Sequence, residues 1–296
     1  MRQKELIALI SLLDDPDDKV YSVITEKLLQ EGEKLIPSLE KALDSTDSTI
    51  IQQRIFSIIH QIQFQTTKQY LGNWVQSGAN SLLEGSVFVA RYRYPELSVS
   101  HIDECLEKMK QGVIAEINEK FTPLEKIKVL NHVFFVLLGF KGNSTNFYSP
   151  ENHYINQLIE TKKGGPVSLS ILYSLVAHKL GLPIHCVSLP RNFILAYLGD
   201  SQTVENHANP EKTVLFYINP FNSGALLRRK DIEQFLTSNN LEINEEYFYP
   251  CSNRITITQL IASLMLSYQK IGLKENVDEL KECIELVAGS SYTGDY

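Results

Sequence analysis

The chain has 296 residues, 43% of them hydrophobic, and a formal net charge of −7. A chain of this length and composition can bury a sizeable core without disulfides or metal ions. Its charges are spread along the sequence rather than gathered in a basic run, so we expect no face that binds nucleic acid.

Targeting segments and metal-binding motifs are not evident. The opening stretch MRQKELIALISLLDDPDD is interrupted by charge well short of a membrane span, and no cleavage site follows it. We therefore expect a cytoplasmic protein without membrane contact. The four cysteines lie far apart without CxxC spacing, and the histidines form no metal-binding motif. The pattern indicates reduced thiols and neither a metal ion nor a cofactor.

Residues 1–68 contain a weak internal repeat. The segments SLLDDPDDKV (11–20) and KALDSTDSTI (41–50) align without gaps, and each is typical of a helix end, an acidic turn and a new helix start. Asp17 and Asp47 are expected to accept hydrogen bonds from the free N–H groups of those starts. The pattern resembles HEAT-type helix pairs, which present one face to a partner.

Residues 69–140 keep a helical pattern. The runs SLLEGSVFVARYRYPEL and HIDECLEKMKQGVIAEI carry apolar residues three and four positions apart, and Pro95 separates them. In the next run, TPLEKIKVLNHVFFVLLGF, Thr122 is expected to cap a helix that begins at Pro123. Its wide apolar face predicts a helix of the core.

Residues 141–250 change in character. The stretch KKGGPVSLSILYSL predicts a tight turn and then a core helix that begins at Pro166 and closes at Gly181. Three strand-like runs follow, PIHCVSL, NFILAYLG and TVLFYINPF, and the polar loop DSQTVENHANPEK is expected to join the last two as a hairpin. A core helix followed by an antiparallel sheet predicts an α+β fold.

Residues 251–296 are expected to form two amphipathic helices joined near Gly272. The spacing of Tyr268, Gly272 and Val277 is similar to that of a tetratricopeptide unit. An ordinary helical hairpin packed on the core fits the same pattern.

A glycine turn, a core helix and an antiparallel sheet together resemble the transglutaminase-like superfamily, which has a papain-like core. The blocks YPEL, LGFKGNSTNFYSPENHYINQLIETKKGGPVSLSILYSLVAHKLGLPI and YINPFNSG resemble its bacterial SirB type over about residues 80–290. That resemblance implies a helical N-terminal region, this core and tetratricopeptide-like helices at the end.

The resemblance also implies where a catalytic triad would lie. Catalytic members of the superfamily use a cysteine at the start of the core helix, a histidine on the second strand and an aspartate on the third. Here the matching positions hold Pro166, Asn192 and Asn219. Proline has no nucleophilic atom and neutral asparagine carries no proton near pH 7, so the group required at each step is missing.

Two neighbouring side chains could replace a lost nucleophile. Ser168 lies two positions beyond Pro166, roughly 200° around the helix, so we expect it to face away and act as a cap or packing group. Cys186 follows on the next strand, and we expect a buried structural thiol, with recruitment into catalysis as the alternative.

Polar and aromatic residues gather around the start of the core helix. Their amides fit turns formed with their own backbone, and the alternative is that they bind a peptide or small polar ligand. The candidate binding residues, two of them cationic, are Asn146, Tyr148, Asn152, Lys163, Ser168 and Arg191.

The sequence leaves two functions open. The first is a non-catalytic module that binds a protein or peptide partner, favoured by the joint loss of nucleophile, base and orienting group. The second is a thiol-dependent amidase, protease or acyl transferase that uses a recruited residue such as Cys186.

Overall fold

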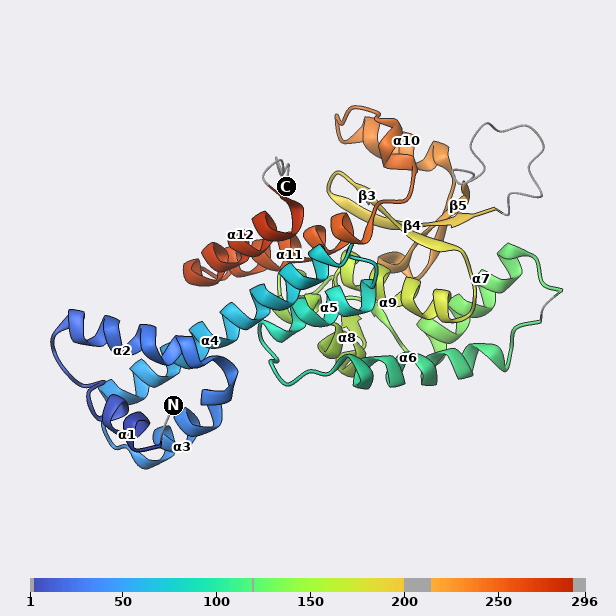
Figure 1. Cartoon of the computed structure of the whole chain (residues 1–296). Coiled ribbons are helices and arrows are strands. Elements are labelled where there is room, and N and C mark those ends of the chain that lie inside the picture. The colour runs from blue at the N-terminus through green and yellow to red at the C-terminus, as the bar shows by residue number, and fades with distance from the viewer. Residues whose placement is uncertain (1–2, 119, 200–213, 290–296) are drawn as a thin grey trace. The chain divides into compact units, whose positions relative to one another are not determined.

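A computed structural model describes residues 3–118, 120–199 and 214–289 of the chain (Figure 1). Its contacts divide the chain into two compact units, Met1–Tyr70 and Leu71–Tyr296. The long helix α4 (Thr49–Gln76) continues past this division. It also runs through the boundary expected between residues 68 and 69.

The first unit is a set of helices around one apolar core. Its helices α1 (Gln3–Ser11), α2 (Asp18–Glu31) and α3 (Ile36–Ser45) precede α4, and a 3₁₀ turn, Gly32–Leu35, links α2 to α3. The fully buried side chains of this core include Leu13, Leu28, Leu39, Ile55 and Ile58.

The two acidic turns of this unit are capped differently. Asp17 caps α2, as expected, because its carboxylate accepts a hydrogen bond of 2.8 Å from the Lys19 N–H. The prediction for Asp47 is wrong. At the start of α4 the Ser48 hydroxyl accepts from the Ile51 N–H at 3.4 Å, since serine stands one residue nearer the helix.

The second unit begins with three helices, α5 (Leu82–Arg91), α6 (Val99–Ile114) and α7 (Pro123–Asn131). Thr122 caps α7 in a reciprocal capping box with Glu125. The helix then widens into a π-helical turn, His132–Leu137. This turn rotates Val136 and Leu137 outward, 66% and 58% exposed, so the apolar run does not face the core along its whole length.

The central helix α9 (Pro166–Lys179) is buried on all sides from Val167 to Ala177. Ahead of it lie β1 (Lys141–Gly142), a 3₁₀ turn at Pro150–His153, α8 (Ile155–Thr161) and β2 (Lys163–Gly164). Strands β1 and β2 pair in parallel, which aligns Lys141 with Lys163.

The strands that follow α9 form one antiparallel sheet in the order β3-β4-β5-β6. They span Ile184–Leu189, Asn192–Leu198, Val214–Asn219 and Ala225–Leu227. The predicted pairing of the second and third strands is confirmed, and the polar loop expected between them lies outside the described residues. The α+β fold class is confirmed.

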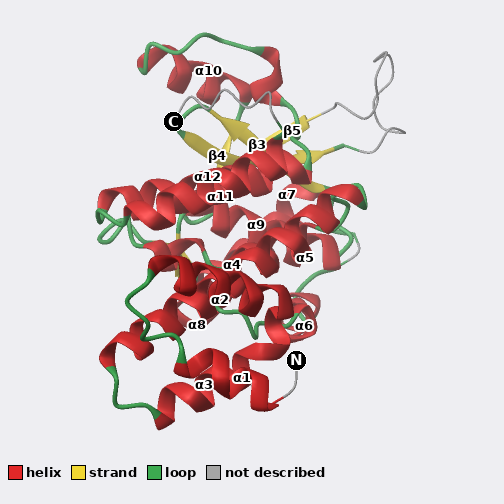
Figure 2. Cartoon of the chain, turned by 60° about the vertical axis from the view of Figure 1, so that its left-hand side comes forward, coloured by secondary structure: helices red, strands yellow, loops and turns green. Residues whose placement is uncertain are grey.

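Figure 2 shows the sheet between α10 (Arg229–Ser238) on one face and the helical layer with α9 on the other. Val187, Ile194, Ala196 and Tyr217 pack on the α10 face with Ile232 of that helix. Alternation along the strands leaves the intervening side chains on the α9 face, as the contact between Cys186 and Ser174 of α9 shows.

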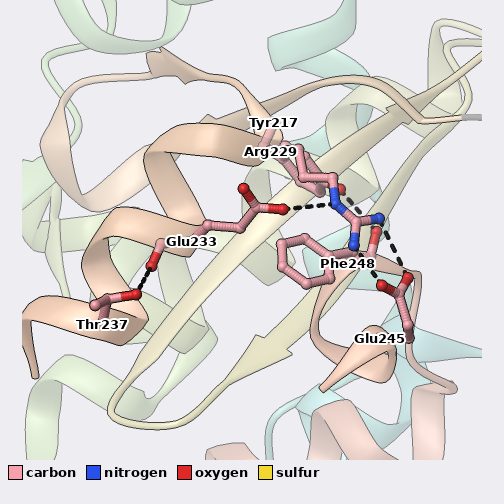
Figure 3. Close-up of polar contacts among 6 residues, drawn as sticks. All are labelled: Tyr217, Arg229, Glu233, Thr237, Glu245 and Phe248. Carbon is pink, nitrogen blue, oxygen red and sulfur yellow. Dashed lines mark hydrogen bonds and ion pairs between the residues drawn. The ribbon is translucent and has the colours of Figure 1, made fainter. Parts of the chain in front are cut away.

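Arg229 attaches α10 to the 3₁₀ turn Glu245–Phe248 (Figure 3). Its Nε donates to Glu233 at 2.9 Å, and its terminal nitrogens pair with the Glu245 carboxylate while the guanidinium lies over the Phe248 ring. The Tyr217 hydroxyl donates to the Phe248 carbonyl at 2.9 Å and links the same turn to β5.

The chain ends in a helical hairpin, α11 (Asn253–Lys270) and α12 (Lys274–Ala288). Gly272 makes the turn with φ of +81°, a conformation that favours glycine. Two helices joined at this point confirm the expected hairpin. Helix α11 also packs on α5 and α9 and so joins the hairpin to the core.

Candidate functional site

Of the two glycines before α9, Gly164 is needed for close packing. A side chain at Gly164 would place its Cβ 2.8 Å from Leu158 and 3.0 Å from the Ser168 hydroxyl. Gly165 donates its N–H to the Asn152 carbonyl at 3.1 Å. Pro166, half-buried, is the first helical residue, as predicted.

Ser168 is part of this helix start. Its buried hydroxyl donates to the Asn152 carbonyl at 2.5 Å and accepts from the Gly165 N–H at 3.1 Å. The side chain therefore turns back toward the N-cap and joins it to the preceding loop.

Asn192 and Asn219 lie at the end of the sheet nearest the start of α9. The link from α9 to β3 is short and Cys186 contacts Ser174, so β3 runs back along the helix toward its N-terminus. The start of β4, which holds Asn192, and the end of β5, which holds Asn219, therefore both lie at the end of the core where α9 begins. Alternation places Asn192 on the face of Ile194 and Ala196, which carries α10.

Both asparagines bond locally. The Asn192 Oδ1 accepts from the Phe193 N–H at 2.8 Å, and the Asn219 Oδ1 accepts from the Asn222 N–H at 3.2 Å, which caps the 3₁₀ turn Pro220–Asn222. Within the described ranges no hydrogen bond joins these two side chains to each other or to Pro166. None of the three side chains titrates or attacks a carbonyl near pH 7.

Cys186 is buried between the sheet and the helices. Its Sγ lies 3.9 Å from the Ser174 hydroxyl, and its carbonyl accepts from the Cys251 N–H at 2.8 Å. Burial, with a smaller contribution from the neighbouring Cys251 thiol, raises the pKa of the Cys186 thiol well above its ordinary value. A thiol in this environment stays protonated near pH 7, which opposes nucleophilic chemistry.

We expect Cys186 to resist alkylation in the folded protein. At pH 7 iodoacetamide should modify it at least about a hundredfold more slowly than a free model thiol, because little thiolate forms and the sulfur is covered. Half-buried Cys105 provides the internal comparison. Peptide mapping by mass spectrometry measures both rates. Rapid, single modification at Cys186 would contradict this expectation and favour the thiol-enzyme alternative.

The asparagine-rich loop before α9 is held by one buried side chain, Asn152. Its Nδ2 donates to the carbonyls of Asn146 at 2.7 Å and Phe147 at 2.9 Å, and its Oδ1 accepts from Asn143 at 2.8 Å. Asn143 in turn accepts from the Asn146 N–H at 3.2 Å. The amide atoms of Asn152 are thus used to fix the loop rather than to face solvent.

The braced loop holds two aromatic side chains outward. Phe147 and Tyr148 are 41% and 44% exposed, and their rings meet edge to face with centroids 5.2 Å apart. Phe221, after β5, meets Phe147 edge to face at 5.8 Å. The exposed Lys270 of α11 places its Nζ 5.4 Å from the centre of the Tyr148 ring. We call Phe147, Tyr148, Phe221 and Lys270 the aromatic strip.

The aromatic strip was only partly predictable. Tyr148 was a candidate from sequence, whereas Phe221 and Lys270 come from distant segments and gave no local signal. Gly142 is the local feature that relates to the position of Phe221, because a Cβ there would lie 2.8 Å from the Phe221 ring. The fold thus requires glycine where the Phe221 segment crosses β1.

The remaining candidates are cations at the surface. Lys163 is exposed and pairs across β1–β2 with Lys141, also exposed. Arg191 is exposed in the β3–β4 turn with φ of +59°. In the described part of the chain, neither lysine forms an ion pair, and no group of three metal-ligating side chains could hold a metal ion.

The fold agrees with the family comparison. A family model described as Transglutaminase-like superfamily matches residues 100–262. Because the match covers more than half of the chain, the chain belongs to that superfamily.

Bacterial and animal relatives extend this result. The chain is 29% identical over 154 residues to a UPF0162 protein of Xylella fastidiosa, which covers 52% of this chain and 50% of the relative. It is 28% identical over 160 residues to a UPF0162 protein of Vibrio cholerae, with 53% and 54% covered. It is 23% identical over 228 residues to human F-box only protein 21, with 70% and 35% covered.

The chain spans about half the length of the bacterial relatives named above. No solved structure matches it. Within the described residues, none of the helices is both long enough and apolar enough to cross a membrane.

Proposed function

We propose that this chain is a non-catalytic protein of the SirB type that binds a partner protein through a peptide segment at the aromatic strip. The observation that carries the proposal is the strip itself: two exposed rings on a loop fixed by the buried Asn152, met by the half-buried ring of Phe221 from a distant segment. Exposed aromatic groups on a rigid support are typical anchors of protein interfaces.

The lack of catalytic groups supports a binding role. Pro166, Asn192 and Asn219 stand where the resemblance places nucleophile, base and orienting group, and the side chains of both asparagines are engaged locally. The thiol that was the candidate for recruitment, Cys186, is buried with a raised pKa. Three simultaneous losses leave no evident route to acyl transfer.

The other helical parts fit an interaction protein. We propose that residues 1–68 are HEAT-like and that residues 251–296 are tetratricopeptide-like. The segment 69–140 would then be the helical part of the SirB-type region, and 141–250 the transglutaminase-like core. Repeats of these types add surface for protein contacts. We also propose that the protein is cytoplasmic.

The test compares three full-length proteins as affinity baits. They are the parent, the double variant Phe147→Ser/Tyr148→Ser, and the control Phe56→Ser, which removes an exposed phenylalanine from the first unit. A partner that binds the strip should bind the double variant with about thirtyfold lower affinity than the parent. It should bind the control as tightly as the parent. Partners recovered equally by all three baits would contradict the proposal.

A further inference from the structure

The aromatic strip presents side chains from a turn rather than from a strand. Phe147 and Tyr148 both lie in the turn that precedes the 3₁₀ residues Pro150–His153. The Phe147 ring stands at 85° to Tyr148 and at 84° to Phe221. Of these rings, Phe147 and Tyr148 are exposed and Phe221 is half-buried. Exposed rings that meet edge to face suit the rings of proline in an extended polyproline II segment.

The loop that carries Phe147 and Tyr148 is preorganised in the unbound protein. The Asn152 side chain fixes the carbonyl of Phe147, and the Asn152 carbonyl accepts from Gly165 and Ser168 at the start of α9. The loop is therefore tied to the central helix of the core. A polyproline II segment is also ordered in advance, so both partners lose little conformational entropy on binding.

The charge beside the rings favours an acidic ligand. Lys270 is exposed with its ammonium beside the Tyr148 ring, where it would repel a second cation and attract a carboxylate. Glu151, the nearby acid, accepts a hydrogen bond from the Tyr94 hydroxyl at 2.6 Å. A nucleic acid fits less well, because the chain carries a net charge of −7.

From these contacts we propose that the aromatic strip binds a proline-containing, acidic peptide segment of the partner protein. Proline rings pack on Phe147, Tyr148 and Phe221, and an aspartate or glutamate pairs with Lys270. This inference rests on the proposed function, since it names the class of partner for the same surface.

The test is selection of a random peptide library, displayed on phage, on the immobilised full-length protein. The expected result is enrichment of peptides that combine proline with aspartate or glutamate. A selected peptide, synthesised and titrated by calorimetry, should bind Phe147→Ser/Tyr148→Ser at least about tenfold more weakly than the parent. Lys270→Glu should weaken acidic peptides similarly and should improve matched peptides in which lysine replaces the acid.

The outcomes separate the two proposals. Selected peptides that need Phe147 and Tyr148 but lack proline or acidic residues would overturn this inference and leave peptide binding at the strip intact. Peptides that bind the double variant as well as the parent would overturn both. Selective binding of single-stranded DNA, used as a second probe, would also overturn the acidic-peptide inference. Circular dichroism of each variant shows whether its fold is retained.

Discussion

Replacing Gly224 with alanine should destabilise the second unit by about 2 to 4 kcal/mol. Gly224 has φ of +72°, and a Cβ on it would lie 2.2 Å from the Asn131 Oδ1. Asn131 donates to the Gly224 carbonyl at 2.9 Å and accepts from the buried Tyr173 hydroxyl at 2.8 Å. Moving Asn131 away leaves that hydroxyl unpaired, which costs about 1 to 3 kcal/mol beyond the backbone strain.

Gly181 offers a matched control, because it has the same φ of +72° and a Cβ there would meet nothing within 4 Å. Gly181→Ala should therefore cost only the backbone term, about 1 kcal/mol. Urea denaturation measures both variants. In an Asn131→Ala background, Gly224→Ala should cost little more than Gly181→Ala, since the clashing side chain is gone. Equal losses for the two glycine variants in the parent background would contradict this account.

Local signals in the sequence predicted much of the core. The Gly-Gly-Pro turn, the cap at Thr122 and the turn at Gly272 act over a few residues, and the structure has each of them. The pairing of the second and third strands was also predicted, as a hairpin across a polar loop. The position of Pro166 at the start of α9 follows from the same local rules.

Features that depend on distant contacts were not predictable from the sequence. The ring of Phe221 meets Phe147 only because β5 ends beside β1. The Arg229 contact with Glu245 and the π-helical turn at His132–Leu137 likewise depend on packing. The sequence left open whether the asparagines of the loop before α9 form turns or bind a ligand, and the fold shows that Asn152 fixes the backbone from which the aromatic side chains extend.

Acid should destabilise the protein through His153, before most carboxylates are protonated. The His153 ring is buried, its Nε2 lies 2.8 Å from the Ser267 hydroxyl, and its Nδ1 has no hydrogen-bond partner among the described residues. Burial lowers the pKa of His153 from 6.5 to about 4. Between these values the unfolded chain binds a proton that the folded chain does not, so stability is present above pH 6.5 and is lost as the pH falls toward 4.

The loss from this one group should reach about 3 kcal/mol at pH 4, at about 1.4 kcal/mol per pH unit. Urea denaturation at a series of pH values measures it. His153→Gln removes the titrating ring, so its stability should fall less steeply between pH 6.5 and 4 than that of the parent. Ser267→Ala keeps the buried ring and removes only its partner, so it should be less stable at pH 7 but retain the steep slope. If His153→Gln and the parent had parallel curves, the ring would not be the group that senses acid. The same carboxylates titrate in all three proteins. The difference between their curves of stability against pH therefore gives the contribution of the buried His153 ring, which lies against Gly165 at the start of the central helix.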